Sequence, residues 1–358
     1  MAFHLSMWYT KHDLAKRIGF FISAGAVSGA FGGLIAYGVS SIKHSKIDKW
    51  RILFLIEGCP SVLLAICVAL FMPNRPETSR YLNEDERTLC LTRLNAQNLQ
   101  ETNHGIDWRG VIRCLTDWKT YVVSIMYSCM NLTLGSVTGF LPTIVQSGFG
   151  FTAARAQLMT VPPYAVALVV MLLITAYSDR QQTRGVPVMI PFTLGIIGWA
   201  ILLAVPAAHM THSESSARYF ACICIVTAGY CNIPLIMGTS TTALLTALPL
   251  TPSAWQSSNT GNQSQRATSL GMLNTVGQCL SVAASFLFPT KEKPSFHKGV
   301  TVNLTFQCLG LVLAICMTLY YRWENRRRDR VEGGRPPKGA PLDVIEKHDL
   351  APGFRYVP

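Results

Sequence analysis

Long apolar segments alternate with short polar ones along most of the chain. Each apolar segment runs for about twenty residues with few charges, which is the length that a helix needs to cross a lipid bilayer. The segments lack the polar face at 3.6-residue spacing that a surface helix of a soluble protein shows. The pattern therefore predicts about eight transmembrane helices. They fall at residues 18–42, 52–72, 120–145, 157–177, 186–206, 217–237, 268–289 and 301–321.

Two long polar stretches interrupt this pattern. The first contains NEDERTLCLTRL, which has the acidic first turn of a short amphipathic helix with Asn83 at its N-cap position. The second ends the sequence, and its content of charge, Pro and Gly predicts disorder. The predicted organisation is a two-helix part at 1–72, a cytoplasmic loop at 73–117, a six-helix part at 118–322 and a disordered cytoplasmic tail at 323–358.

Composition and charge support a membrane protein. Hydrophobic residues make up 49% of the chain and charged residues only 14%, against about 25% charged residues in a soluble domain. A formal net charge of +12 would raise the question of nucleic acid in a soluble protein. Here the basic residues flank apolar segments and concentrate in every second connection, so they set topology instead. Both ends of the chain are predicted to be cytoplasmic, and no cleavable signal peptide is visible.

The remaining chemistry-bearing residues argue against several classes of protein. Most of the 11 cysteines lie inside apolar segments, where free cysteine behaves as a small hydrophobe, and none has metal-ligand spacing. All 8 histidines fall in loops or tails, which disfavours a membrane acyltransferase with a catalytic histidine at membrane depth. No Gly-rich phosphate loop follows a strand, so an ATP-driven pump is unsupported. We predict that the protein is not an enzyme and that it binds no cofactor or metal. The remaining class is solute transport driven by an ion gradient.

Several stretches carry a family resemblance that extends over nearly the whole chain, to about Arg330. They are LSMWYTKHDLAKRIGFFISAGAVSGAFGGLIAYGV, KWRILFLIEGCPSVLLAICVALFMPNRPETSRYLNEDER, AYSDRQQTRG, AWQSSNTGNQSQRATSLGMLNTVGQ and YYRWENRRRDR. Together they resemble the fungal anion:cation symporters, the allantoate and nicotinate permease branch of the major facilitator superfamily.

The resemblance implies a twelve-helix family fold in which this sequence starts near the end of the fourth helix. The chain would then lack the first three to four helices, and residues 1–72 would hold the last two helices of the N-terminal bundle. All six helices of the C-terminal bundle would follow at 118–322. The stretch GTSTTALLTALPLTPS at 238–253 interrupts a place where the family runs on almost directly, so it is either an insertion or the product of an imperfect gene model.

The turn AYSDRQQTRG places Asp179, Arg180 and Arg184 between two apolar segments. It resembles the Asp-Arg loop motif of the superfamily, in its C-terminal-half copy. In the family such loops act as latches between two helix bundles that rock against each other. Gln181 and Gln182 stand where more basic residues are common. The alternative is an ordinary basic turn with no latch role.

The first two apolar segments hold two further features. Gly25, Gly29 and Gly33 are spaced by four, and small residues let helix backbones approach closely in lipid. This surface serves either static packing or sliding of one helix on another. Glu57 is the one carboxylate well inside an apolar segment, where an ionisable group is costly and a functional candidate. It is either a proton-coupling residue or a structural partner, for example of Arg51.

Polar residues in three apolar segments are candidates for a substrate cavity. In a bilayer such groups normally face a bundle interior or a water-filled space. For each of them, a hydrogen bond between helices is the alternative. The candidates are Asn131, Thr133 and Ser136 in the third segment, Tyr230 and Asn232 in the sixth, and Asn274 and Gln278 in the seventh.

These observations predict an all-α membrane protein of the major facilitator type. The resemblance implies proton-coupled uptake of a small organic anion, such as a carboxylate vitamin or a ureide, by alternating access in the plasma membrane. The predicted partners are that anion, a proton and the lipid bilayer, with no nucleic acid. The alternative is a non-transporting or regulatory membrane protein derived from a truncated transporter.

Overall fold

The computed structural model describes most of the chain, and every regular element in the described ranges is a helix. Six of these helices are long and apolar enough to cross a membrane. The predicted fold class, an all-α membrane protein, is therefore confirmed. The described residues are 11–42, 47–73, 79, 81–98, 108–149, 151–181, 183–205, 212–237, 255–260, 263–292, 295–334 and 348–358.

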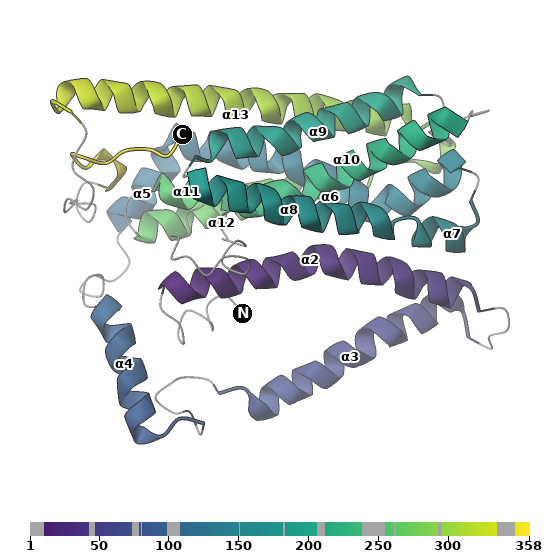
Figure 1. Cartoon of the computed structure of the whole chain (residues 1–358), viewed down its shortest axis with the longest axis horizontal. Coiled ribbons are helices and arrows are strands. Elements are labelled where there is room, and N and C mark those ends of the chain that lie inside the picture. The colour runs from purple at the N-terminus through teal and green to yellow at the C-terminus, as the bar shows by residue number, and fades with distance from the viewer. Residues whose placement is uncertain are drawn as a thin grey trace.

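The larger part of the structure is a bundle of long helices that runs along the molecule (Figure 1). Helix α6 packs against α10, α12 and α13, while α9 packs against α10 and α13, and α8 against α10. The short helix α7 (Ala153–Leu158) precedes α8, and α11 (Trp255–Ser258) precedes α12. The long members are α6 (Trp118–Phe149), α8 (Val161–Gln181), α9 (Gly185–Ala204), α10 (His212–Met237), α12 (Gln263–Ala284) and α13 (His297–Val331).

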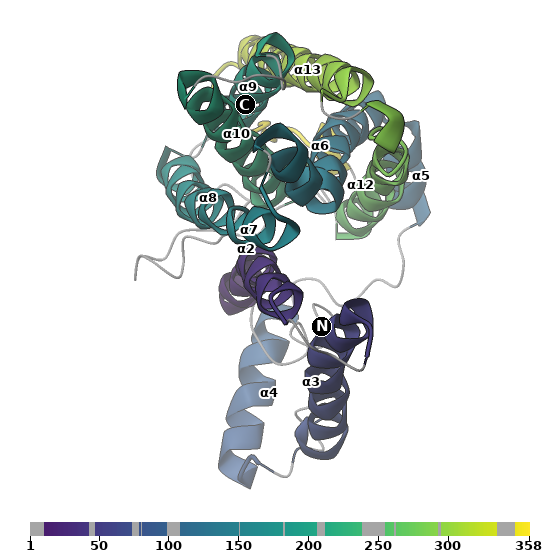
Figure 2. The same cartoon turned by 90° about the vertical axis from the view of Figure 1, so that its right-hand side faces the viewer.

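The first two helices lie to one side of this bundle. Helix α2 (Lys11–Ser40) packs along α8 and α7, and α3 (Lys49–Phe71) packs mainly on α2. Both views place α2 between the bundle and α3 (Figures 1 and 2). No residue of α3 is buried. The side chains of α3 are therefore exposed on the surface of the protein.

Two shorter helices follow in the polar connection. Helix α4 (Glu84–Asn98) begins directly after Asn83, as the sequence predicts. The Glu86 carboxylate accepts a hydrogen bond of 3.0 Å from the Asn83 backbone N–H, which is half of a capping box. Helix α5 (Trp108–Thr116) packs against α12 at one end of the bundle. We call this the inner end, because the distribution of basic residues predicts that it faces the cytoplasm.

The end of the chain differs from the disorder predicted for residues 323–358. Helix α13 continues to Val331, and residues 348–358, which include the 3-10 helix η4 (His348–Leu350), fold back onto the inner end. Ala351, Phe354 and Tyr356 are buried there in an apolar cluster. Burial of these side chains offsets the entropy of ordering a segment whose composition favours disorder. Residues 335–347, and the interrupting stretch 238–253, lie outside the described residues.

Candidate functional site

A band of polar side chains crosses the middle of the bundle, between two apolar clusters. The outer cluster includes Trp199 and Phe288, and the inner cluster includes Phe192 and Trp255. On α6, residues 123–130 contribute to the inner cluster and residues 137–145 to the outer one. The polar stretch 131–136 lies between them. The band therefore sits at the depth that corresponds to the middle of a spanning helix.

One part of the band joins α6 to α13. The Thr133 hydroxyl accepts a hydrogen bond of 2.7 Å from the Gln307 amide. The Asn303 amide donates to the Ser136 hydroxyl at 3.0 Å, and the Thr133 hydroxyl donates to the Asn303 amide oxygen at 3.3 Å. All four side chains are buried. Of the cavity candidates, Thr133 and Ser136 thus make helix–helix hydrogen bonds.

Asn303 and Gln307 were not among the residues singled out from the sequence. They stand four positions apart in an otherwise apolar segment, which places both on one face of the helix. That spacing is the signal that could have identified them. Their partners on α6, however, could not be read from α13 alone.

A second part of the band holds amides with unpaired atoms. Asn131 and Asn232 are almost completely buried. Among the described residues, no hydrogen-bond partner meets the amide nitrogen of Asn131 or either polar atom of Asn232. A β-carbon on Gly229 of α10 would lie 3.5 Å from the Cα atom of Leu134 on α6. Helices α6 and α10 run in opposite directions. Asn232 lies about one turn inward from Gly229, and Asn131 lies about one turn inward from Leu134, so the two asparagines are at a similar depth. A buried polar group without a partner costs about 1–3 kcal/mol.

The other cavity candidates have different surroundings. Tyr230 is buried and meets the Tyr164 ring edge-on, with centroids 5.7 Å apart. The half-buried Asn274 donates to the Leu270 carbonyl of its own helix at 3.2 Å. Gln278 is exposed on α12, next to the exposed Thr275. Polar side chains of a membrane protein face protein or water rather than lipid, so Gln278 remains a candidate for contact with a polar solute.

Two of the three glycines on α2 make close contacts. A β-carbon at Gly29 would lie 2.9 Å from the Tyr164 ring, and one at Gly33 would lie 3.1 Å from the Gln157 carbonyl oxygen. No atom lies within 4 Å of the same position at Gly25. Gly29 and Gly33 therefore let α2 approach α7 and α8 closely, while Gly25 has no such role among the described residues.

Glu57 lies on α3 and is exposed. Arg51, the partner considered from the sequence, instead approaches Asp48 at 3.4 Å. Within the described part of the chain, no side chain forms an ion pair with Glu57. Its role as a proton carrier remains a prediction.

The Asp179 turn meets the end of the chain at the inner end of the bundle. Arg184 is buried and its guanidinium donates to the Ser178 hydroxyl at 2.7 Å. The backbone N–H groups of Arg184 and Gly185 donate to the Pro358 carbonyl at 3.0 and 3.2 Å. Arg180 is exposed, and the Asp179 side chain lies outside the described residues. A latch between two bundles remains a prediction for this turn.

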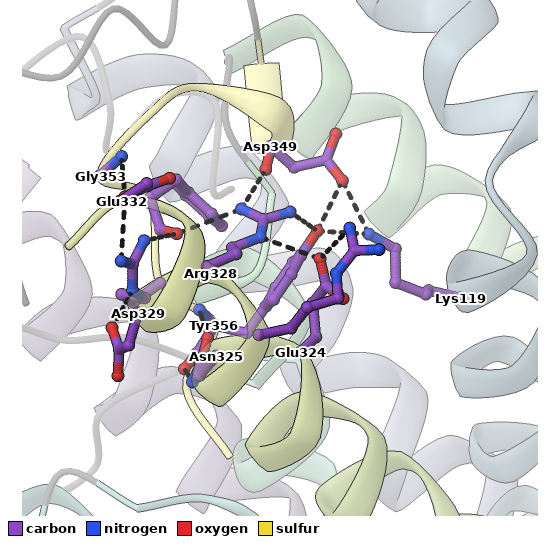
Figure 3. A network of polar contacts seen from close by, with 12 residues as sticks. Lys119, Glu324, Asn325, Arg328, Asp329, Glu332, Asp349, Gly353 and Tyr356 are labelled. Carbon is purple, nitrogen blue, oxygen red and sulfur yellow. Dashed lines mark hydrogen bonds and ion pairs between the residues drawn. The ribbon is translucent and has the colours of Figure 1, made fainter. Parts of the chain in front are cut away.

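Asp349 is the centre of a polar network at the same end (Figure 3). Its fully buried carboxylate accepts hydrogen bonds from Lys119 at 2.7 Å, Tyr356 at 3.0 Å, Arg113 at 3.2 Å and Gln265 at 3.4 Å. Burial by itself would raise the pKa of Asp349. The charges and hydrogen bonds of Lys119 and Arg113 outweigh that effect and lower this pKa well below its usual range.

The rest of segment 348–358 is held by side chains of α11 and α13 and the residue that follows α11. Asn325 forms two hydrogen bonds with the Tyr356 backbone, at 2.7 and 2.9 Å. Trp255 donates to the Val357 carbonyl at 3.0 Å, and the Val357 N–H donates to Asn259 at 2.7 Å. Arg328 donates to the Asp349 carbonyl at 3.0 Å, as Figure 3 also shows. The segment therefore bridges several helices at their inner ends.

Comparisons with known proteins agree with this architecture. The family model of the Major Facilitator Superfamily matches residues 1–286. The High-affinity nicotinic acid transporter of Saccharomyces cerevisiae is 31% identical over 356 residues, which is 99% of this chain and 62% of that protein. The MFS-type transporter efuF of Hormonema carpetanum is 29% identical over 339 residues, which is 94% of this chain and 64% of that protein. This chain thus spans a little under two thirds of the length of these relatives.

A solved structure shows a similar fold. The xylose transporter XylE from E. coli, in a partially occluded inward-open conformation, matches with a TM-score of 0.59 and 17% sequence identity. The match covers 89% of this chain and 66% of that one. At this level of identity the similarity concerns the fold alone.

Proposed function

Because the chain belongs to the major facilitator superfamily, we propose that it serves secondary active transport of a small organic anion across the membrane. The family resemblance, and the location in a membrane with several crossings, are as the sequence predicted. The observation that carries the proposal is the 31% identity with a nicotinic acid transporter along 99% of the chain. Nicotinic acid is a carboxylate vitamin, which is the substrate class that the resemblance implied.

The polar band supports a site for such an anion between α6, α10 and α12. A carboxylate accepts hydrogen bonds, and the amide nitrogens of Asn131 and Asn232, which meet no acceptor in the described part of the chain, can donate them. Gln278 offers a further amide donor on the exposed face of α12, whereas the Thr275 hydroxyl donates to the Gly271 carbonyl of its own helix at 3.0 Å. The Thr133–Asn303–Gln307 network would hold the helices behind this site in register rather than contact the solute.

Coupling to a proton is the finer part of the proposal, and Glu57 is the candidate carrier. A carboxylate on an apolar helix is costly while charged and much less so once protonated. Uptake of a proton with a monovalent carboxylate moves no net charge, so the anion would not have to cross against the membrane potential. The plasma membrane is the proposed location.

Uptake of radiolabelled nicotinate into cells that lack their own nicotinate carrier tests the proposal. We expect accumulation above vector-only cells, faster at acidic than at neutral external pH, and abolished by a protonophore. Glu57→Gln should remove the dependence on external pH. If accumulation occurs without any pH dependence, proton coupling is wrong; if neither nicotinate nor a ureide accumulates, the proposed substrate class is wrong.

A substitution in the polar band tests the location of the solute. Asn232→Ala should raise KM about tenfold, which corresponds to the loss of roughly 1.4 kcal/mol of binding free energy. Thr305→Ala is the control, because its exposed hydroxyl bonds the Thr301 carbonyl of its own helix. An unchanged KM for Asn232→Ala at normal protein levels would place the solute elsewhere.

A further inference from the structure

Helix α5 has two opposite faces. Gly110 and Cys114 are buried on the face toward the bundle. Trp108, Ile112 and Leu115 are 68%, 59% and 48% exposed on the other. The spacing of the exposed residues, i, i+4 and i+7, forms a continuous apolar stripe along one side of a helix. A nine-residue helix thus points its three largest apolar side chains away from the protein.

This stripe continues onto a membrane-spanning helix. Trp118, Tyr121 and Ile125, at the start of α6, are also exposed, by 49%, 43% and 44%. Residues 118–146 form one of the six spans, so this side of α6 faces lipid. The apolar surface therefore runs from the lipid-facing side of α6 directly onto α5, with the exposed Arg109 at its edge.

We propose that α5 lies in the inner interface of the membrane, with Trp108, Ile112 and Leu115 inserted at the boundary between headgroups and acyl chains. Short amphipathic helices bind at this depth through an apolar face, and tryptophan is enriched there. A basic residue beside the stripe suits the anionic lipids of the cytoplasmic leaflet. The partner is the bilayer surface, and the proposal does not depend on which solute the protein carries.

The network around Asp349 holds α5 in this orientation. Nine residues span about 13 Å, and a helix of this length is marginal by itself in water. Arg113 lies on the side that faces the bundle, and its guanidinium pairs with Asp349 at 3.2 Å. Asp349 is fixed in turn by Lys119 at the start of α6. Segment 348–358 thus clamps α5 from the side opposite to the lipid and turns the apolar stripe outward.

Spin labels test both halves of the proposal in the full chain, with the exposed Cys59, Cys67, Cys279, Cys308 and Cys316 replaced by alanine so that only the introduced cysteine is labelled. The protein is reconstituted into vesicles of equal parts phosphatidylcholine and phosphatidylglycerol. Ile112→Cys carries a nitroxide on the stripe, and Thr116→Cys carries one on the neighbouring polar side of the same helix. We expect the label at Ile112 to show a severalfold higher ratio of oxygen to water-soluble nickel accessibility than the label at Thr116. Equal ratios would overturn the interfacial position of α5.

Asp349→Asn tests the clamp, with Leu350→Ala as its control because Leu350 is exposed in the same segment. We expect Asp349→Asn to increase the mobility of the label at Ile112 severalfold and to leave a label at Leu319 of α13 unchanged. Leu350→Ala should alter neither label. If Asp349→Asn changes neither label, or loosens both alike, the clamp on α5 is overturned. Nicotinate uptake by the unlabelled protein is measured separately, so a failure of the transport proposal does not bear on this result.

Discussion

The ammonium group of Lys119 lies 2.7 Å from the carboxylate of Asp349, although 230 positions of the sequence separate the two residues. Both side chains are buried, with exposed fractions of 8% and 0%. The pair joins the first turn of α6 to the segment that closes the inner end of the bundle. Loss of one partner leaves the other charge buried, which costs far more than the loss of a surface ion pair.

Substitution of Lys119 is expected to destabilise the protein strongly. Lys119→Met removes the shortest hydrogen bond to Asp349, and breaking a buried pair in this way costs about 3–5 kcal/mol. The measurement is thermal unfolding of the purified protein in detergent. Lys298→Met is the matched control, because Lys298 also pairs with a carboxylate, at 3.2 Å, but is 85% exposed. Equal effects of the two substitutions would show that the Asp349 network does not carry the expected stability.

Docking of segment 348–358 through Asp349 is expected to be independent of pH between about 5 and 8. The pKa of Asp349 is lower in the folded protein than in the unfolded chain, where an aspartate titrates at about pH 3.9. The stabilisation is therefore complete above the unfolded pKa and is lost only as pH falls toward the lower folded value. Lys119, Arg113 and Tyr356 surround this carboxylate.

Hydrogen exchange at the Tyr356 and Val357 amides, corrected for intrinsic rates, measures this docking. Both amides donate to side chains outside the segment, those of Asn325 and Asn259. Protection should stay constant across the neutral range. Release of both amides between about pH 6 and 7 would mean that another group controls the segment.

Glycine at position 33 is expected to be essential for the packing of α2. Gly33→Leu brings a side chain against the Thr160 hydroxyl and the Gln157 backbone, where a β-carbon would already lie at 2.7 and 3.1 Å. The helices must then separate and lose dispersion contacts along the seam. Gly38→Leu is the control, since no atom of the described residues lies within 4 Å of its β-carbon position. Protein abundance in membranes and thermal stability are the measurements. Similar tolerance at both positions would argue against a tight contact of α2 with α7 and the turn before α8.

Asn303 is expected to support the bundle rather than bind the solute. Asn303→Leu removes the hydrogen bonds to Ser136 and Thr133, and bonds of this kind between membrane helices contribute about 0.6 to 1.7 kcal/mol. The free energy of unfolding should fall by roughly that amount. KM for a transported solute should stay within about twofold of the parent value, which corresponds to a change of less than about 0.5 kcal/mol in binding free energy. A large rise in KM with unchanged stability would move Asn303 into the solute site.

The sequence by itself determined the helices whose composition the lipid bilayer dictates. A bilayer requires long apolar segments with internally satisfied backbones, so the helices of the bundle could be placed from composition alone. The spacing of Gly25, Gly29 and Gly33 indicated a close approach of helices, and among the described residues close contacts occur at Gly29 and Gly33 but not at Gly25. Only the tertiary structure decided which polar groups meet. Asn303 and Gln307 find their partners on α6 because two distant helices pack at one depth. Asp349 becomes an anchor because its segment, polar and proline-containing by composition, reaches a buried site lined by Arg113 and Lys119. Such contacts depend on the packing of residues far apart in sequence, which local patterns do not encode.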